Sequence, residues 1–174
     1  MIDERFYEGL IRDFSSWKKP VDDLSFQVKA GALLAAEARL LDQCRYEDWL
    51  KLYSAECVYW VPATPGGDPR REVAVAFDDR RRLEDRIFRL RTGSAWSQVP
   101  ASRTVRLLSN VEVFENMMVR SNFLITEWRA GDTQHWAGWC GHRLKRRGAS
   151  LEIEVKQVNL IDCDQSLRNP SIVL

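Results

Sequence analysis

The sequence predicts an α+β fold in which a strongly curved, mostly antiparallel sheet wraps around N-terminal helices. Three observations support this class. Helical periodicity is concentrated in the first half of the chain, strand-like segments follow one another in the second half, and short turns separate those strands. Helices enclosed on the concave side of such a sheet would form a cone of the cystatin-like kind.

An N-terminal extension, residues 1–25, is expected to precede a single cone-shaped domain, residues 26–174. The extension has mixed character and carries a short helix over residues 4–14. The first long helix is predicted over residues 25–43, with Ser25 as its N-cap because a serine side chain can accept a bond from the first free amides. A short helix over residues 46–52 follows.

Glu37 falls in the middle of the apolar face of the first long helix. A carboxylate buried there requires a partner, so an arginine, a tyrosine or a backbone group is expected beside it. A structural ion pair explains this residue better than a catalytic acid, because networks that only stabilise the fold also bury charge.

The middle of the chain reads as strand, loop and helix. Residues 57–61 form a short apolar strand that ends at Pro62, and residues 62–69 form a loop. A helix then begins at Asp78 or Asp79, whose carboxylate can cap it, and ends at Gly93. Acidic residues alternate with the arginines of this helix, which favours a solvated, self-paired surface over a nucleic-acid patch.

Four strands are predicted over residues 102–114, 117–129, 134–146 and 151–163, with turns at Gly131 and Gly148. In the first of them, alternation places four apolar side chains on one face: Val105, Leu107, Val111 and Val113. In the last, residues 151, 153 and 155 have one parity and residues 158 and 160 the other. That strand is therefore buried on both faces or contains a β-bulge.

Charge and cysteine usage limit the partners to be expected. Lys plus Arg number 26 and Asp plus Glu number 25, so no global charge favours nucleic acid or a membrane surface. No apolar run approaches the roughly 18 residues of a membrane span, and the first ten residues lack the apolar core of a signal peptide. A cytoplasmic location is expected. The scattered cysteines, expected to be free thiols, are Cys44, Cys57, Cys140 and Cys163.

The two histidines restrict the chemistry open to this chain. Cys140-Gly141-His142 matches half of a Rieske ligand pattern, but no cysteine is followed three residues later by a histidine. His135 and His142 are seven apart, so on one strand they point to opposite faces and cannot share an iron. Cys140 lies among tryptophans, which favours an inert core thiol over a nucleophile paired with His142. No cofactor-binding or metal-ligating residue is therefore expected here.

Two classes of function that need no metal ion stay open. A metal-free acid–base enzyme, a dehydratase or isomerase, could use Tyr59, one histidine (His135 or His142) and Asp78 or Glu37 inside a cone pocket. A small-molecule binding module could use the same cone without chemistry. The sequence does not show whether the cone is filled by side chains or open to a ligand.

The stretch DDRRRLEDRIFRLRTGSAWSQVPASRTVRLLSNVEVF, residues 78–114, resembles the small (beta) subunits of aromatic-ring-hydroxylating dioxygenases. The early EARLLD run at residues 37–42 and the closing residues 158–174 are also similar to that family, whereas the extension up to Pro20 is not aligned with it. Trp96, Arg103 and Asn110 match the family's motif. With Glu37, they are the candidates for fold or interface residues.

The resemblance implies a cone-shaped fold like that of nuclear transport factor two and scytalone dehydratase. It implies a structural subunit of a multicomponent oxygenase that hydroxylates an aromatic ring in aromatic-compound catabolism. The large (alpha) subunit would carry the Rieske [2Fe–2S] cluster and the mononuclear iron, and a separate reductase would supply electrons from NADH. Three large and three small subunits would form a hexamer with homotrimer contacts. This chain should then have a hydrophobic and arginine-rich surface that is exposed in the single subunit and buried by a partner in the hexamer.

Overall fold

The computed structural model describes residues 4–15, 17–165 and 171–174. Its helices are α1 (Glu4–Ser15), α2 (Leu24–Asp42), α3 (Tyr46–Leu50) and α4 (Arg80–Thr92), with 3₁₀ turns η1 (Trp96–Gln98) and η2 (Glu115–Met117). Its strands are β1 (Tyr53–Pro62), β2 (Ala74–Asp79), β3 (Arg103–Val113), β4 (Met118–Arg129), β5 (Asp132–Arg147) and β6 (Ser150–Leu160). The predicted α+β class is confirmed.

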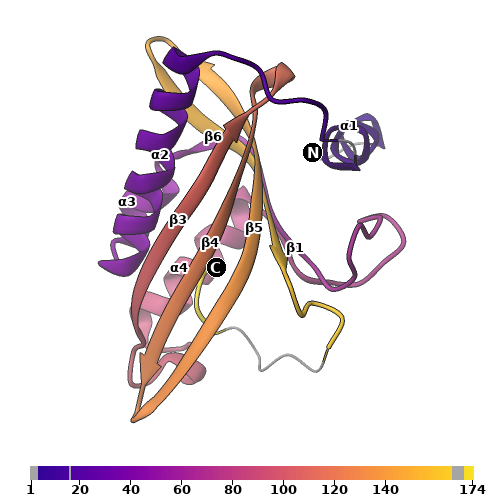
Figure 1. Ribbon diagram of the computed structural model, residues 1–174. Helices are drawn as coiled ribbons and strands as arrows, with labels where there is room; N and C mark the ends of the chain where they lie inside the picture. The colour runs from indigo at the N-terminus through magenta and orange to yellow at the C-terminus, as the bar shows by residue number, and fades with distance from the viewer. Residues whose placement is uncertain (1–3, 16, 166–170) are drawn as a thin grey trace.

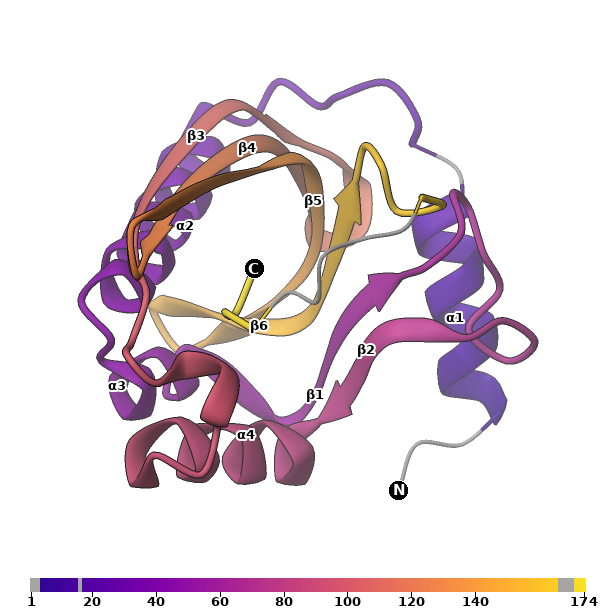
Figure 2. The ribbon, with the colours of Figure 1, turned by 90° about the horizontal axis from the view of Figure 1, so that it is seen from below.

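The strands form one sheet in the order β2-β1-β6-β5-β4-β3. All neighbours are antiparallel except β1 and β6, which are parallel. Seen along its axis in Figure 2, the sheet curls into an incomplete ring, with α1 outside the ring near β1 and β2. Helix α2 runs beside the edge strand β3 (Figure 1) and packs against it and β6.

Helix ends agree with the predictions to within two residues, and one predicted cap is wrong. The N-cap of α2 is Asp23, not Ser25, because the Asp23 carboxylate accepts a 2.8 Å bond from the amide of Phe26. Asp79 caps α4 by accepting from the amide of Arg82 at 2.9 Å, and Gly93 ends that helix with a left-handed φ of 73°.

Strand β2 was missed by the sequence reasoning. It is an edge strand in which Asp78 alone is fully buried, so its residues show little alternation. The pair Asp78-Asp79 at its end is also a helix-start signal, and that signal hid the strand. Strand β1 is longer than expected: it begins at Tyr53, whereas the predicted strand began at residue 57.

A bulge in β6 accounts for the shift in its apolar pattern. Arg143 and Leu144 of β5 pair with Val155 and Ile153, so Glu154 is an extra residue on β6. Ile153 lies in the interior core, whereas Val155 lies in a second cluster on the outer face of the sheet. Both predicted explanations therefore hold: the strand contains a bulge, and it is buried on both faces.

A second bulge, in β3, corrects the prediction that its valines and leucine share one face. Ser109 pairs with Asn122 and Glu112 with Arg120, so β3 has one residue more than β4 in this interval. Asn110 lies within it in the left-handed region, with φ 52°. Val105 and Leu107, before the bulge, are 61% exposed, whereas Val113, after it, is buried in the interior core.

Helix α1 covers the outer face of the sheet. Leu10 and Phe14 are buried in an outer cluster together with Val58, Trp60, Phe114, Met118 and Val155. The fit is close at Gly141 of β5, where a Cβ atom would lie 2.7 Å from the Trp17 ring and 2.9 Å from the Phe14 ring. A glycine is needed at this position for α1 and the residues after it to lie flat on the strand.

None of the helices in the described parts of the chain is long and apolar enough to cross a membrane.

Candidate functional site

A buried polar cluster lies inside the cone, centred on the carboxylate of Glu37 from α2. Tyr53 of β1 donates its hydroxyl to Glu37 Oε1 at 2.7 Å, and the indole of Trp49 from α3 donates to the same oxygen at 3.1 Å. Lys156 Nζ from β6 lies 3.1 Å from Oε1. His142 Nε2 from β5 is 3.6 Å from Oε2. The predicted tyrosine partner is present, and the cation is a lysine rather than an arginine.

The two charges of this cluster stabilise each other. Burial alone would raise the pKa of Glu37, but the Lys156 ammonium and the hydrogen bond from the Tyr53 hydroxyl hold it well below its usual range. Burial would lower the pKa of Lys156, and the Glu37 carboxylate outweighs this effect and raises it. The pair is therefore ionised at neutral pH, which is the arrangement that a buried charge needs.

His142 is a neutral neighbour of this ion pair rather than a member of it. Burial is the main cause that lowers its pKa, against a smaller opposing effect of Glu37. Its 3.6 Å approach to Glu37 is too long for a hydrogen bond, and neither ring nitrogen has a hydrogen-bond partner in the described residues. Cys140, on the same face of β5, is buried, and burial raises the pKa of its thiol to about 12. That thiol is too weak an acid to act as a nucleophile at neutral pH.

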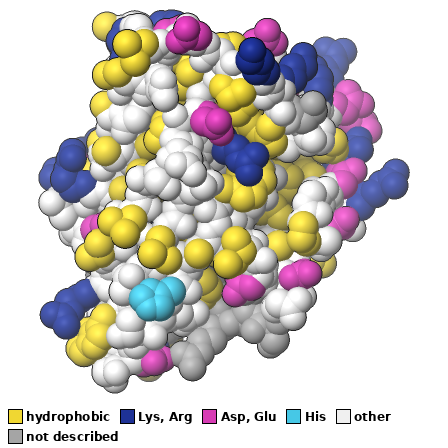
Figure 3. Space-filling model, viewed as in Figure 1, with side chains coloured by type: hydrophobic (Ala, Val, Ile, Leu, Met, Phe, Trp, Pro, Cys, Tyr) yellow, Lys and Arg dark blue, Asp and Glu magenta, His cyan; other side chains and the backbone are white. Residues whose placement is uncertain are grey.

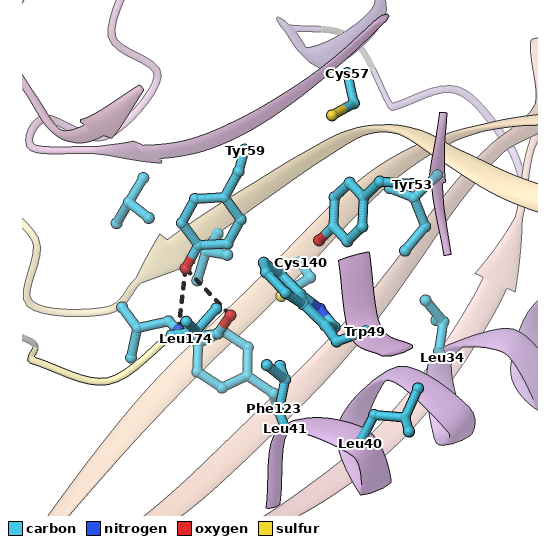
Figure 4. Close-up of a cluster of buried hydrophobic side chains, with 14 of the residues drawn as sticks. Leu34, Leu40, Leu41, Trp49, Tyr53, Cys57, Tyr59, Phe123, Cys140 and Leu174 are labelled. Atoms are coloured by element: carbon cyan, nitrogen blue, oxygen red, sulfur yellow. Dashed lines mark hydrogen bonds between the residues drawn. The ribbon is translucent and has the colours of Figure 1, made fainter. Parts of the chain in front are cut away.

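The interior of the cone is filled by the chain's own residues 172–174, all of which are buried (Figures 2 and 4). The Tyr59 hydroxyl accepts a 3.0 Å bond from the Leu174 amide and donates to the Leu174 oxygen at 3.2 Å. Lys156 donates to the same oxygen at 3.1 Å, and Arg106 donates to the oxygen of Val173. The cone is thus closed by its own polypeptide.

The residues present do not fit either iron site. His142 is buried in the cone, whereas His135 is exposed and its Nδ1 lies 3.1 Å from Thr126 Oγ1, so the two imidazoles lie on opposite faces as predicted. Within the described residues, no three histidine, cysteine or carboxylate side chains are grouped so as to hold a metal ion. Cys140 and His142, which match half of a Rieske ligand pattern, lie in the packed interior, and the Cys140 thiol is protonated.

The proposed acid–base set is only partly assembled. Glu37, Tyr59 and His142 all face the cone interior. Asp78 instead binds Arg86 of α4, whose Nε donates to it at 2.9 Å, and His135 is on the outer face. Of the three residues that come together, Tyr59 is hydrogen-bonded to Leu174 through both the amide and the oxygen of that residue.

The sequence of this chain matches a known protein family. The family model described as "Ring hydroxylating beta subunit" matches residues 36–165. That match spans well over half of the chain. The chain belongs to the family of ring-hydroxylating beta subunits.

This beta subunit is similar to several curated relatives. It is 34% identical to the 2-halobenzoate 1,2-dioxygenase small subunit of Burkholderia cepacia, over 74% of this chain and 84% of the relative. It is 29% identical to the benzoate 1,2-dioxygenase subunit beta of Acinetobacter baylyi, over 80% and 88%. It is therefore a beta subunit of a multicomponent dioxygenase that hydroxylates aromatic rings.

Solved structures show the same fold. The beta subunit of benzoate 1,2-dioxygenase from Burkholderia mallei superimposes with a TM-score of 0.65 at 28% identity, covering 83% of this chain and 93% of that one. An NTF2-like protein with a cystatin-like fold from Novosphingobium aromaticivorans gives a TM-score of 0.59 at 14% identity, over 93% and 92%. The predicted cone is confirmed.

The other sequence candidates of this beta subunit lie outside the cone. Trp96, in η1, is 87% exposed. The guanidinium of Arg103, at the start of β3, lies 4.2 Å from the ring centroid of Trp128. Asn110 is exposed at the β3 bulge. The structure therefore brings none of these three to Glu37.

An apolar area on the outer face of β3 and β4 was missed by the sequence reasoning. Val105 pairs with Thr126 and Leu107 with Leu124, next to the Arg103–Trp128 stack. We define the outer patch as the exposed members of this area: Val105, Leu107, Leu124 and Trp128. Figure 3 shows hydrophobic side chains gathered over this side of the molecule. The alternation of β3 carried the signal in the sequence. Because the bulge was not predicted, Val105 and Leu107 were placed on the same face as Val113, which is buried.

Proposed function

We propose that this beta subunit is a non-catalytic support for a large oxygenase subunit. The observation that carries the proposal is the closed interior of the cone, where residues 172–174 occupy the space that a substrate would need. The nearby groups support it too, because the thiol of Cys140 is protonated and Glu37 is already bound by Tyr53, Trp49 and Lys156.

The redox centres are proposed to belong to the partner. A Rieske [2Fe–2S] cluster and a mononuclear iron on the large (alpha) subunit would supply oxygen activation, with electrons delivered from NADH through a separate reductase. The placement of His135 and His142 on opposite faces supports this division, because neither site can be built from them. We also propose that the complex works in the cytoplasm, where free thiols such as the buried Cys57 and Cys140 stay reduced.

A hexamer of three large and three small subunits is the proposed assembly, with contacts between the small subunits in a homotrimer. The outer patch supports it, because contiguous exposed apolar side chains are typical of interfaces. Trp96 and Arg103 are proposed interface residues, since exposed Trp and Arg are enriched at binding hot spots. Asn110 and Glu37 are proposed fold residues: one shapes the bulge and the other holds the buried ion pair.

The substrate class is proposed from the relatives' names. The relatives include subunits of 2-halobenzoate, benzoate and p-cumate dioxygenases, the last from Pseudomonas putida at 34% identity. All three substrates are aromatic carboxylates, so we propose that class for the complex that contains this chain.

A reconstituted complex tests the division of labour. His135→Gln, His142→Gln and Cys140→Ser are each introduced into the beta subunit, and turnover of benzoate is measured at saturating NADH and reductase. We expect kcat within about twofold of the unmodified complex, because removal of a true acid–base group typically costs ~100-fold or more. A loss of that size in an assembled complex would show that the beta subunit takes part in the chemistry, and would favour the acid–base alternative built on His142.

A further inference from the structure

The segment that closes the cone is bound through side chains rather than by strand pairing. Both main-chain groups of Leu174 bond to the hydroxyl of Tyr59, and the oxygen of Leu174 also accepts from Lys156. The oxygen of Val173 accepts from Arg106, and Ser171 Oγ accepts a 2.7 Å bond from Gln98. A strand of a sheet is held by its main chain. These residues are instead held as a pocket holds a ligand.

The apolar part of this binding also resembles a pocket. The side chains of residues 172–174 are buried within the interior core, beside aromatic side chains of three different elements (Figure 4). These aromatic residues are Trp49, Tyr59 and Phe123. An occupant of this space therefore needs a compact apolar body with one oxygen directed at Tyr59 and Lys156.

The cone interior also contains a side chain whose hydrogen-bonding groups are unused. His142 is 2% exposed, and its two ring nitrogens have no hydrogen-bond partner among the residues described. Leaving such a buried group without a partner destabilises the folded chain. Since His142 lies 3.6 Å from Glu37, beside the ion pair with Lys156, the unused capacity lies at the polar end of the occupied space.

The charge balance of the interior selects the chemical class of an occupant. Glu37 and Lys156 neutralise each other, and Arg106 is paired with Asp42. A further buried charge would lack a counter-ion and would be expensive. A ketone or amide oxygen could accept the same two hydrogen bonds, from Tyr59 and Lys156, that the oxygen of Leu174 accepts now.

We propose that the cone interior is a binding site for a small apolar molecule with an uncharged carbonyl oxygen, and that residues 171–174 occupy it as a reversible plug. The proposed occupant is bound and not transformed, so the site adds to the support role of the proposed function and does not replace it. A complex that assembles normally can pass or fail the tests below independently of the proposed function.

Reversibility is tested first on the full chain in its native complex, by hydrogen exchange read by mass spectrometry. The amide of Leu174 is compared with amides inside β1 and β6. We expect the Leu174 amide to exchange at least 100-fold faster, because the plug leaves while the sheet stays folded. Exchange of all these amides at one common rate would show that the tail opens only with the core, and would overturn the proposal.

The chemical class is tested with two probes of similar shape, acetophenone and ethylbenzene, by calorimetry on the complex carrying V173G and L174G. This change removes the apolar anchors of the plug and keeps its main chain. Acetophenone should bind at least tenfold more tightly than to the unmodified complex and at least tenfold more tightly than ethylbenzene, and adding Tyr59→Phe should weaken it. Ile161→Gly, at a 78% exposed position, is the control and should change nothing.

Equal binding of the two probes, or no acetophenone binding by a variant that keeps its near-ultraviolet circular dichroism, would contradict the proposal. If the glycine variant does not fold, the exchange rates of the unmodified chain decide alone.

Discussion

At the scale of single residues, the interior of the cone depends on one ion pair. Glu37 and Lys156 are both buried, and their charged groups are 3.1 Å apart. Two hydrogen bonds from Tyr53 and Trp49 complete the coordination of the carboxylate. Such a pair adds little to stability compared with a well-packed apolar pair, but the loss of one partner leaves a buried, uncompensated charge.

Glu37→Gln is therefore expected to lower the free energy of unfolding by about 3–5 kcal/mol. The same substitution at Glu84, which forms an exposed pair with Arg80 at 2.9 Å, should cost less than about 1 kcal/mol. Urea unfolding measures both. In a double-mutant cycle, adding Lys156→Met should recover part of the loss. Strictly additive effects of the two changes would rule out the coupling.

Acid should destabilise the protein through His142. Because its folded-state pKa lies below the ordinary value of 6.5, the unfolded chain binds the proton more readily. The stability that it contributes is complete above pH 6.5 and is lost as pH falls, by up to about 1.4 kcal/mol per pH unit. Glu37 adds a further loss only below its ordinary value of 4.5, since its pKa is also lowered.

Unfolding curves between pH 7 and pH 5 measure this effect. His142→Gln should flatten the slope, whereas His135→Gln, on the exposed outer face, should leave it unchanged. A slope that survives in the His142 variant would assign the titration to another group.

The sequence predicted that Glu37 is buried beside a polar partner, but it did not predict the lysine. The apolar face of the helix established that Glu37 is buried and needs a partner. Lys156 could not be found this way, because the bulge at Glu154 reverses the faces of β6 and turns a residue of apparently outward parity toward the cone.

At the scale of elements, two bulges decide which side chains face the core. Alternation was read correctly within each half of β3 and β6, and wrongly across the bulge of β3. The signal for that bulge is weak: asparagine tolerates the left-handed conformation better than most residues, but it also occurs in ordinary strands. Only the pairing of Ser109 and Glu112 with β4 reveals the extra residue.

Helix α1 should be displaced by Gly141→Ala. The added methyl group would lie 2.7 Å from the ring of Trp17, so the helix or the strand must move, at a cost of about 1–3 kcal/mol. Limited proteolysis should then cleave within the first 25 residues more rapidly. Gly31→Ala in α2 is the matched control and should be neutral or slightly stabilising, because beyond its own helix backbone and chain neighbours its methyl group would meet no atom within 4 Å. Identical cleavage of both variants would contradict the close fit.

At the scale of the whole molecule, the outer face of the sheet has the features of a binding surface. The charged residues are nearly balanced over the chain, so the attraction of a partner must come from local features rather than net charge. The outer patch supplies apolar area, and the stack of Arg103 on Trp128 borders it with a rigid cation. The class of the fold was predictable from the sequence, but this patch was not, because it follows from the β3 bulge.

Leu107→Asp is expected to weaken assembly at least tenfold without unfolding the chain, since a charge in an apolar interface loses its water. Val73→Asp makes the same change at a position 84% exposed in a loop, and should leave assembly intact. Size-exclusion chromatography of the co-expressed subunits compares the two. Normal elution of the Leu107 variant would place the interface elsewhere.

We propose that this beta subunit works as a support within a complex whose redox centres lie on another chain. Native mass spectrometry of the tagged chain, purified from its own cells, tests this proposal most directly. We expect a hexamer with equal numbers of this chain and of a heavier chain that carries all of the iron. A homo-oligomer without a heavier partner, or iron that stays with this chain after the subunits are separated, would contradict it.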